Sequence, residues 1–222
     1  MDNFNLKCPP KNVLIFGDSY STFEGYIPEG YGIYYYKNGR EDNDITKVTE
    51  TWWHLLSEEL DLNIVHNNSW SGSTICYTGY GNTDRSHSTS FIYRLSQLYE
   101  NGFFENNKID TVFIFGGTND CWAESPLGEE TFGDYSHENL FNVLPAISYI
   151  IKRVREILPE ANVISIVNDG LKPEIAKAVI SASEKYDTSY VLLENIDKSN
   201  GHPTAKGMQE IKEQILKQIQ TL

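Results

Sequence analysis

Five short apolar segments recur along the chain, and longer stretches with helical periodicity separate them. Each segment is too short for a helix and is rich in Val, Ile and Phe; they span residues 12–16, 63–66, 111–115, 162–167 and 189–193. Because their apolar character is uninterrupted, we expect strands that are covered on both faces. This alternation predicts an α/β fold, a parallel sheet with helices on both sides. The ligand site of such a sheet lies beyond the carboxyl ends of its strands.

Apolar residues spaced three or four apart predict a helix in each intervening stretch. Pro145 and Pro173 fit the first turns of the third and fourth helices. Residues 23–49, rich in glycine and tyrosine, follow neither period and are interpreted as an irregular insertion. The 222 residues contain no linker-like tract, so we predict a single domain over residues 1–222. The helical stripes are Trp52, Leu55, Leu56 and Leu60; Phe91, Leu95 and Leu98; Ile147, Ile151, Val154 and Leu158; Ile175, Val179 and Ala182; and Met208, Ile211, Ile215, Ile219 and Leu222.

The charge balance excludes several classes of partner. The chain has 31 acidic and 18 basic residues and a net charge of −13, which argues against binding to nucleic acid or to anionic membranes. No apolar run reaches the roughly 18 residues of a transmembrane helix. The scattered cysteines, Cys8, Cys76 and Cys121, indicate neither a disulfide framework nor a zinc site and favour a reducing compartment. The first residues lack the apolar core of a secretory signal, so we expect a cytoplasmic protein.

Four polar segments follow predicted strands: GDSYS at 17–21, SWSGST at 69–74, GGTND at 116–120 and GHP at 201–203. Each alone also fits a polar turn or a helix cap, and a lone histidine is more often structural than catalytic. The first segment lacks the glycines of a nucleotide-binding loop. An aspartyl phosphatase would need a second acid where Tyr20 stands. Pro203 fits the beginning of the last helix, which would place His202 on the loop that enters it.

Together, in this order, the four segments closely resemble the blocks of the SGNH, or GDSL-type, family of serine hydrolases. The resemblance spans residues 17–203 and implies a flavodoxin-like, three-layer α/β/α sandwich around a five-stranded parallel sheet. It also implies an esterase or lipase that needs neither cofactor nor metal. By the same resemblance, Ser19 corresponds to the nucleophile and His202 to the base, while Gly72, Asn119 and the backbone N–H of Ser19 correspond to the oxyanion donors. Chemistry agrees, because a serine hydroxyl needs a neutral imidazole to take its proton and the substrate oxyanion needs preorganised donors.

One position departs from the family pattern. The family carries an aspartate three residues before the histidine, and this chain has Ser199 there. Asp197 is the nearest acid, and a local insertion would bring its carboxylate to the imidazole. A backbone carbonyl near Ser199 is the alternative partner, which would leave a Ser19–His202 dyad. We therefore carry Asp197 forward as a candidate third catalytic residue. Asp18 and Asp120 are interpreted as acids that brace the loops by hydrogen bonds.

The loops favour a polar substrate over a fatty one. They are rich in Tyr, Trp, Asn and Asp, and no long apolar segment suits an acyl chain. We therefore expect a small-molecule or carbohydrate ester, with an acetyl group removed from a sugar as the leading hypothesis. Tyrosines 31–36 would either stack on sugar rings or anchor their own loop. Trp52 and Trp53 are expected to pack a helix against the sheet. A lipid esterase or thioesterase, and a catalytically silent binding module on the same fold, are the alternatives.

Overall fold

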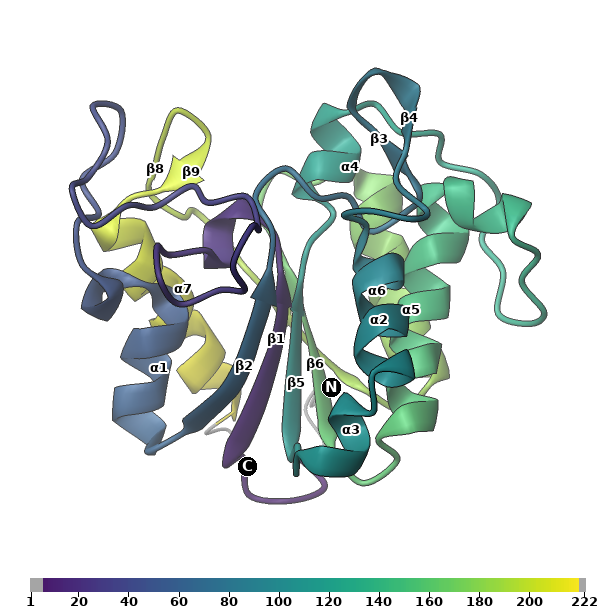
Figure 1. Ribbon diagram of the computed structural model, residues 1–222, viewed down its shortest axis with the longest axis horizontal. Helices are drawn as coiled ribbons and strands as arrows, with labels where there is room; N and C mark the ends of the chain where they lie inside the picture. Colours follow the sequence, from purple (N-terminus) through teal and green to yellow (C-terminus); the bar gives the residue numbers. More distant parts are fainter. Residues whose placement is uncertain (1–5, 220–222) are drawn as a thin grey trace.

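The computed structural model describes residues 6–219 and has a five-stranded sheet at its centre (Figure 1). The strand order is β2-β1-β5-β6-β7, and every neighbouring pair is parallel. The strands are β1 (Asn12–Gly17), β2 (Asn63–Ser69), β5 (Thr111–Phe115), β6 (Asn162–Val167) and β7 (Ser189–Leu192). All five predicted strands are therefore confirmed, and β1 and β2 each continue beyond the predicted end.

The helices are α1 (Trp52–Leu60), α2 (Phe91–Glu100), α3 (Phe103–Asn106), α4 (Thr118–Trp122), α5 (Val143–Ile157), α6 (Pro173–Lys185) and α7 (Ala205–Ile219). Five helices, α1, α2, α5, α6 and α7, follow the predicted stripes, whereas the short helices α3 and α4 were not predicted. Leu158 follows the end of α5, and Leu222 lies outside the described residues. No helix within residues 6–219 has both the length and the apolar character needed to cross a bilayer.

Short elements occupy the connections. Two small antiparallel hairpins are present, β3 (Thr78–Gly79) with β4 (Thr83–Asp84), and β8 (Lys198–Ser199) with β9 (His202–Pro203). Single 3₁₀ turns are η1 (Ser19–Ser21), η2 (Val48–Glu50), η3 (Tyr80–Asn82) and η4 (Glu138–Phe141). The prediction for Pro203 was wrong, because this proline lies in β9 and α7 begins at Ala205. His202 thus belongs to a paired hairpin rather than to a free loop.

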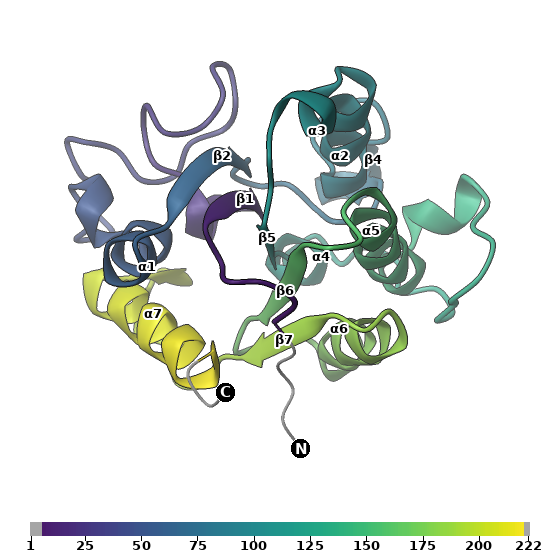
Figure 2. The same ribbon diagram turned by 90° about the horizontal axis from the view of Figure 1, so that it is seen from below.

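The sheet separates two hydrophobic cores. Figure 2 shows the resulting three layers, with α1 and α7 on one face of the sheet and α2, α5 and α6 on the other. Alternate side chains of β1 point to opposite faces, as the strand geometry requires. Leu14 and Phe16 belong to the core under α2, α5 and α6, whereas Val13 and Ile15 belong to the core under α1 and α7. Trp52 is buried edge-on against Phe113 and Phe115, so α1 packs on the sheet as predicted.

Strand register aligns the segments that follow β1, β2 and β5. Gly17 pairs with Ser69 of β2 on one side and with Phe115 of β5 on the other. A Cβ at Gly17 would lie 2.5 Å from both Ser69 Oγ and Ser21 Cβ, so only glycine fits this crowded strand end. The three segments after these strands therefore start at the same level, at the carboxyl edge of the sheet.

Candidate active site

The structure brings Ser19 and His202 into hydrogen-bonding contact. Ser19 opens η1 directly beyond β1, and Asp18 caps this turn by accepting a hydrogen bond from Tyr20 N at 3.0 Å. The Ser19 side chain is 2% exposed, and its Oγ lies 3.0 Å from His202 Nε2. These two residues are separated by 183 positions, and the sheet and the hairpin β8–β9 bring them together.

A tight turn sets the second contact of the imidazole. Asn200 and Gly201 connect β8 to β9 with φ angles of 47° and 77°, the pattern of a type I′ hairpin turn. The turn places the Asn200 carbonyl 3.1 Å from His202 Nδ1. Because a carbonyl only accepts, this contact requires the proton on Nδ1 and leaves Nε2 free to accept from Ser19.

Asp197 does not contact the imidazole. In the hairpin, Ser199 pairs with His202 and Lys198 pairs with Pro203, so Asp197 precedes the paired residues and lies beside Thr204. Its carboxylate accepts a hydrogen bond from Thr204 Oγ1. The interpretation in which Asp197 reaches His202 therefore does not match the geometry. The alternative, a backbone carbonyl near Ser199, matches it through Asn200.

The His202 ring lies among aromatic side chains. Tyr34 stacks on it with centroids 3.5 Å apart and an angle of 8° between the planes. Tyr20 and Trp122 approach it edge-on, each with centroids 5.5 Å away. Burial lowers the pKa of His202 below its ordinary value, and the Asn200 carbonyl only partly opposes this effect. A carboxylate in contact with the ring would have raised that pKa, and Asp197 makes no such contact.

Gly72 follows β2 and Asn119 follows β5, the two strands that flank β1. Gly72 has a φ of 81°, in the left-handed region that favours glycine. Its loop is tied to β1 by a 3.1 Å hydrogen bond from Trp70 N to the Gly17 carbonyl. Asn119 lies in α4, and its Oδ1 accepts from Tyr80 Oη at 2.8 Å. Its Nδ2 is buried and makes no hydrogen bond of normal geometry within residues 6–219, although the amide lies close enough to Asp18 to favour the charge of that carboxylate.

A buried arginine holds these strand ends together. Arg94 of α2 is 1% exposed, and its Nη2 donates to the Gly17 carbonyl at 3.2 Å and to Ser73 Oγ at 3.1 Å. Its Nη1 donates to both oxygens of Asn68, one of them at 2.8 Å. The guanidinium therefore links the end of β1 to the loop that carries Gly72.

Two buried carboxyl groups, Asp18 and Asp120, accept hydrogen bonds from the backbone of the loops, as expected for residues that brace them. Asp120 accepts hydrogen bonds from the backbone N–H groups of Ile75 and Cys76. Burial raises the pKa of Asp18 to about 7, although Tyr20 N, Arg94 and the nearby Asn119 amide favour its charge. The Oδ2 of Asp18 has no hydrogen-bond partner among the described residues. A carboxyl in this setting is partly protonated near neutral pH.

Sequence reasoning missed several residues that shape the site. Asn200-Gly201 is a strong short-range hairpin signal, and it would have placed the Asn200 carbonyl beside the histidine. Tyr34, Arg94 and Tyr80 carry no comparable local signal, because their roles depend on contacts between distant segments. The tyrosine cluster is mostly inward-facing: Tyr34 and Tyr35 are buried, and Tyr36 is exposed. Anchoring of the loop thus describes most of it better than an open sugar-binding surface.

This topology, with helices on both faces of the sheet, is the three-layer fold of the SGNH hydrolases. The sequence matches the family described as GDSL-like Lipase/Acylhydrolase over residues 11–219. The chain therefore belongs to that family. No curated protein matches its sequence.

Solved structures resemble the chain over nearly its whole length. A GDSL-like lipase-family protein from Bacteroides ovatus ATCC 8483 is 40% identical with a TM-score of 0.88, covering 96% of this chain and 99% of the other. One from Bacteroides uniformis ATCC 8492 is 34% identical with a TM-score of 0.86, covering 96% and 97%. The acetyl xylan esterase Est2A from Butyrivibrio proteoclasticus shares the fold at 16% identity and a TM-score of 0.62, covering 95% of this chain and 63% of its own.

Proposed function

We propose that this protein is a serine esterase that removes a short acyl group, acetyl in the first instance, from a carbohydrate. The observation that carries the proposal is the 3.0 Å contact between Ser19 Oγ and His202 Nε2, with Nδ1 held by a carbonyl. In this tautomer Nε2 is the acceptor, so the imidazole is set to take the serine proton during attack. The lowered pKa of His202 keeps the ring neutral at pH 7.

The reaction proceeds in two displacements. Ser19 Oγ attacks the acyl carbonyl as its proton passes to His202 Nε2. The negative charge that develops on the carbonyl oxygen is received by Asn119 Nδ2 and by the backbone N–H groups of Gly72 and Ser19. The intermediate then collapses, the alcohol leaves with the proton from His202, and Ser19 remains acylated. Water repeats the sequence and releases the acid.

Exposed aromatic side chains beside the site support a sugar as the alcohol. Trp122 is 46% exposed and lies against the edge of the His202 ring. Tyr80 is 40% exposed and contacts Asn119. Rings of this kind present an apolar face to a sugar and keep a polar edge in water.

Hydrolysis of p-nitrophenyl esters tests the proposal. We expect the acetate ester to be cleaved faster than the octanoate ester, and acetylated xylan to release acetate. Ser19→Ala should abolish turnover while the far-ultraviolet circular dichroism spectrum stays unchanged. Wild-type rates in Ser19→Ala would remove the serine as nucleophile. A preference for octanoate would instead favour the lipid-esterase alternative.

The absence of a carboxylate contact at His202 keeps the silent binding module as a second candidate. A module of this kind would hydrolyse no acetate ester, and would bind xylan oligosaccharides in a calorimetric titration. An exchange of Trp122→Ala should then weaken the binding. The same exchange in an active esterase should raise KM for acetylated xylan, with little effect on p-nitrophenyl acetate, which lacks a sugar.

A further inference from the structure

The insertion holds the hairpin that carries the histidine through several hydrogen bonds. The carbonyl of Pro203 accepts from Tyr35 Oη at 2.9 Å and from Asn43 Nδ2 at 3.0 Å. The first backbone N–H of α7, at Ala205, donates to Asp44 Oδ1 at 2.8 Å. Figure 1 shows the insertion and the β8–β9 hairpin side by side at the carboxyl edge of the sheet.

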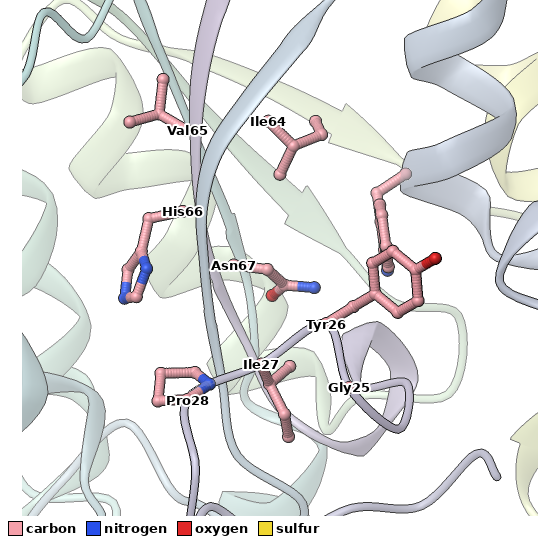
Figure 3. Close-up of a pocket in the computed structure, with 9 residues that line it drawn as sticks. Gly25, Tyr26, Ile27, Pro28, Ile64, Val65, His66 and Asn67 are labelled. Carbon is pink, nitrogen blue, oxygen red and sulfur yellow. The ribbon is translucent and has the colours of Figure 1, made fainter.

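The other end of the insertion rests on the edge strand β2. Tyr26, Ile27 and Pro28 line a pocket together with residues 64–67 of that strand. In Figure 3, Ile64 and Asn67 point to the side of β2 on which Tyr26 lies, and His66 points to the other side. Just beyond β2, Ser71 N donates to the Gly32 carbonyl of the insertion at 2.9 Å. The insertion is thus fixed to the sheet on one side and to the hairpin on the other.

Within the insertion, an aspartate contacts the turn that orients the imidazole. Asn200 Nδ2 donates to Asp42 Oδ2 at 3.0 Å, while the carbonyl of the same Asn200 accepts a hydrogen bond from His202 Nδ1. Arg40 Nε donates to Asp42 Oδ1 at 2.8 Å. Hydrogen bonding to Arg40 and Asn200 lowers the pKa of Asp42 to about 2, so this carboxylate is charged at neutral pH.

The arginine completes a closed ring of contacts. Its guanidinium lies over Tyr34, with Cζ 4.2 Å from the ring centroid, and Tyr34 stacks on His202. Starting from His202, the contacts run through Asn200, Asp42, Arg40 and Tyr34 and return to His202. The hydrogen-bonded branch fixes the direction of Nδ1, and the stacked branch fixes the plane of the ring. The Arg40–Asp42 pair joins the two branches.

We propose that Asp42, a residue of the insertion, replaces the missing acid at position 199 by acting through Asn200. Asp42 is a positioning residue, because it holds the Asn200 carbonyl on His202 Nδ1 without touching the imidazole itself. This inference rests on the proposed role of His202 as the base. It assigns the insertion a function in the reaction, as the support that keeps the imidazole in one tautomer and one orientation.

Kinetics of variants test the link. Asp42→Ala should lower kcat on p-nitrophenyl acetate by about 10- to 100-fold with little change in KM, because a small misplacement of a catalytic group has effects of this size. Asp42→Asn keeps an oxygen that accepts from Asn200, so it should recover part of the loss. Glu41→Ala removes an equal charge from the adjacent, exposed position and should leave the rate unchanged.

A double-variant cycle separates the link from general damage. Asn200→Gly retains the turn and its carbonyl, since glycine adopts positive φ readily, but lacks the side chain that reaches Asp42. If both residues act through one contact, the double variant should be no slower than the slower single variant, to within about twofold. Additive losses, or an Asp42→Ala rate within about twofold of wild type, would overturn the inference.

Nitrogen-15 NMR of His202 tests the same link without turnover. The wild type should hold the proton on Nδ1, and Asp42→Ala should mix the tautomers. Charged groups around the ring predict the direction of its pKa change: Asp42 raises that pKa, whereas Arg40 and Lys198 lower it. Asp42→Ala should therefore lower the pKa of His202 further. An unchanged tautomer and pKa would overturn the inference, even if the esterase activity is real. A changed tautomer in a protein without esterase activity would leave the link standing and refute the proposed function.

Discussion

Replacement of Asp18 by asparagine should make the stability of this protein markedly less sensitive to pH. Burial raises the pKa of Asp18 from 3.8 to about 7 in the folded chain. The unfolded chain therefore loses this proton at a lower pH than the folded chain does. Between pH 4 and pH 7 the folded state binds more protons, so its stability falls as the pH rises. Above pH 7 the loss is complete.

The magnitude follows from the two pKa values. A difference of about 3 units, at 1.36 kcal/mol per unit, corresponds to about 4 kcal/mol of the free energy of unfolding. This is a large part of the 5–15 kcal/mol that is typical of whole domains. Asparagine keeps an oxygen that accepts from Tyr20 N but has no proton to lose. The variant should therefore gain up to about 4 kcal/mol relative to wild type between pH 4 and pH 8.

Urea unfolding, followed by tryptophan fluorescence at several pH values, measures this difference. A difference in the free energy of unfolding that is the same at every pH reflects contacts changed by the substitution itself, such as those with the Asn119 amide. Asp61→Asn provides a flat control, because the hydrogen bond from Lys11 lowers the pKa of that exposed carboxyl below its ordinary 3.8. Folded and unfolded chains therefore both keep Asp61 charged above about pH 5, and the difference between this variant and wild type should barely change from there to pH 8. A difference between Asp18→Asn and wild type that stays constant from pH 4 to pH 8 would refute the reasoning.

Three further predictions concern the reaction. Asn119→Ala should lower kcat by about 10²–10³-fold with a smaller change in KM, since a donor to the oxyanion acts mainly in the transition state; a change in KM alone would make Asn119 a substrate-binding residue. Asp197→Asn should change kcat by less than about 10-fold, because its carboxylate contacts Thr204 and the Asn200 carbonyl is unaltered; a loss near 10⁴-fold, as in a true triad, would contradict the geometry. The acidic limb of kcat/KM should lie below pH ~6.5, because burial lowers the pKa of His202 and only the neutral ring accepts a proton. The profile is best measured in Asp18→Asn, which lacks the second group that titrates near this pH. A limb above pH 7 in that variant would contradict the lowered pKa of His202.

Local patterns predicted the sheet and the segments at its edge. The strands were recognisable because burial on both faces leaves uninterrupted runs of Val, Ile and Phe. The contact between Ser19 and His202 followed from the resemblance of the four polar segments to a family, and from the rule that parallel strands end at one edge. Neither source specifies atoms, which is why the partner of His202 Nδ1 stayed open between Asp197 and a carbonyl.

The insertion was the least predictable part. Within residues 23–47 the backbone follows no helical or strand period, so its conformation depends on contacts with distant residues. Asp42 resembled any other charged loop residue in the sequence. Its proposed positioning role depends on the contact with Asn200, which is distant in the sequence. The hairpin, in contrast, was predictable from Asn200-Gly201, and its register excludes contact between Asp197 and the imidazole.

The ring of contacts between the insertion and the hairpin also affects the order in which the molecule folds. Asp42 and Asn200 are 158 positions apart, and Asp44 and Ala205 are 161 apart. Joining segments so distant carries a loop-closure entropy that grows with separation, and contacts of this range form slowly. During synthesis the insertion leaves the ribosome long before the hairpin exists, so its polar groups stay hydrated until the hairpin forms. Hydrolytic competence should accordingly be acquired late in folding, after the sheet and its helices are in place.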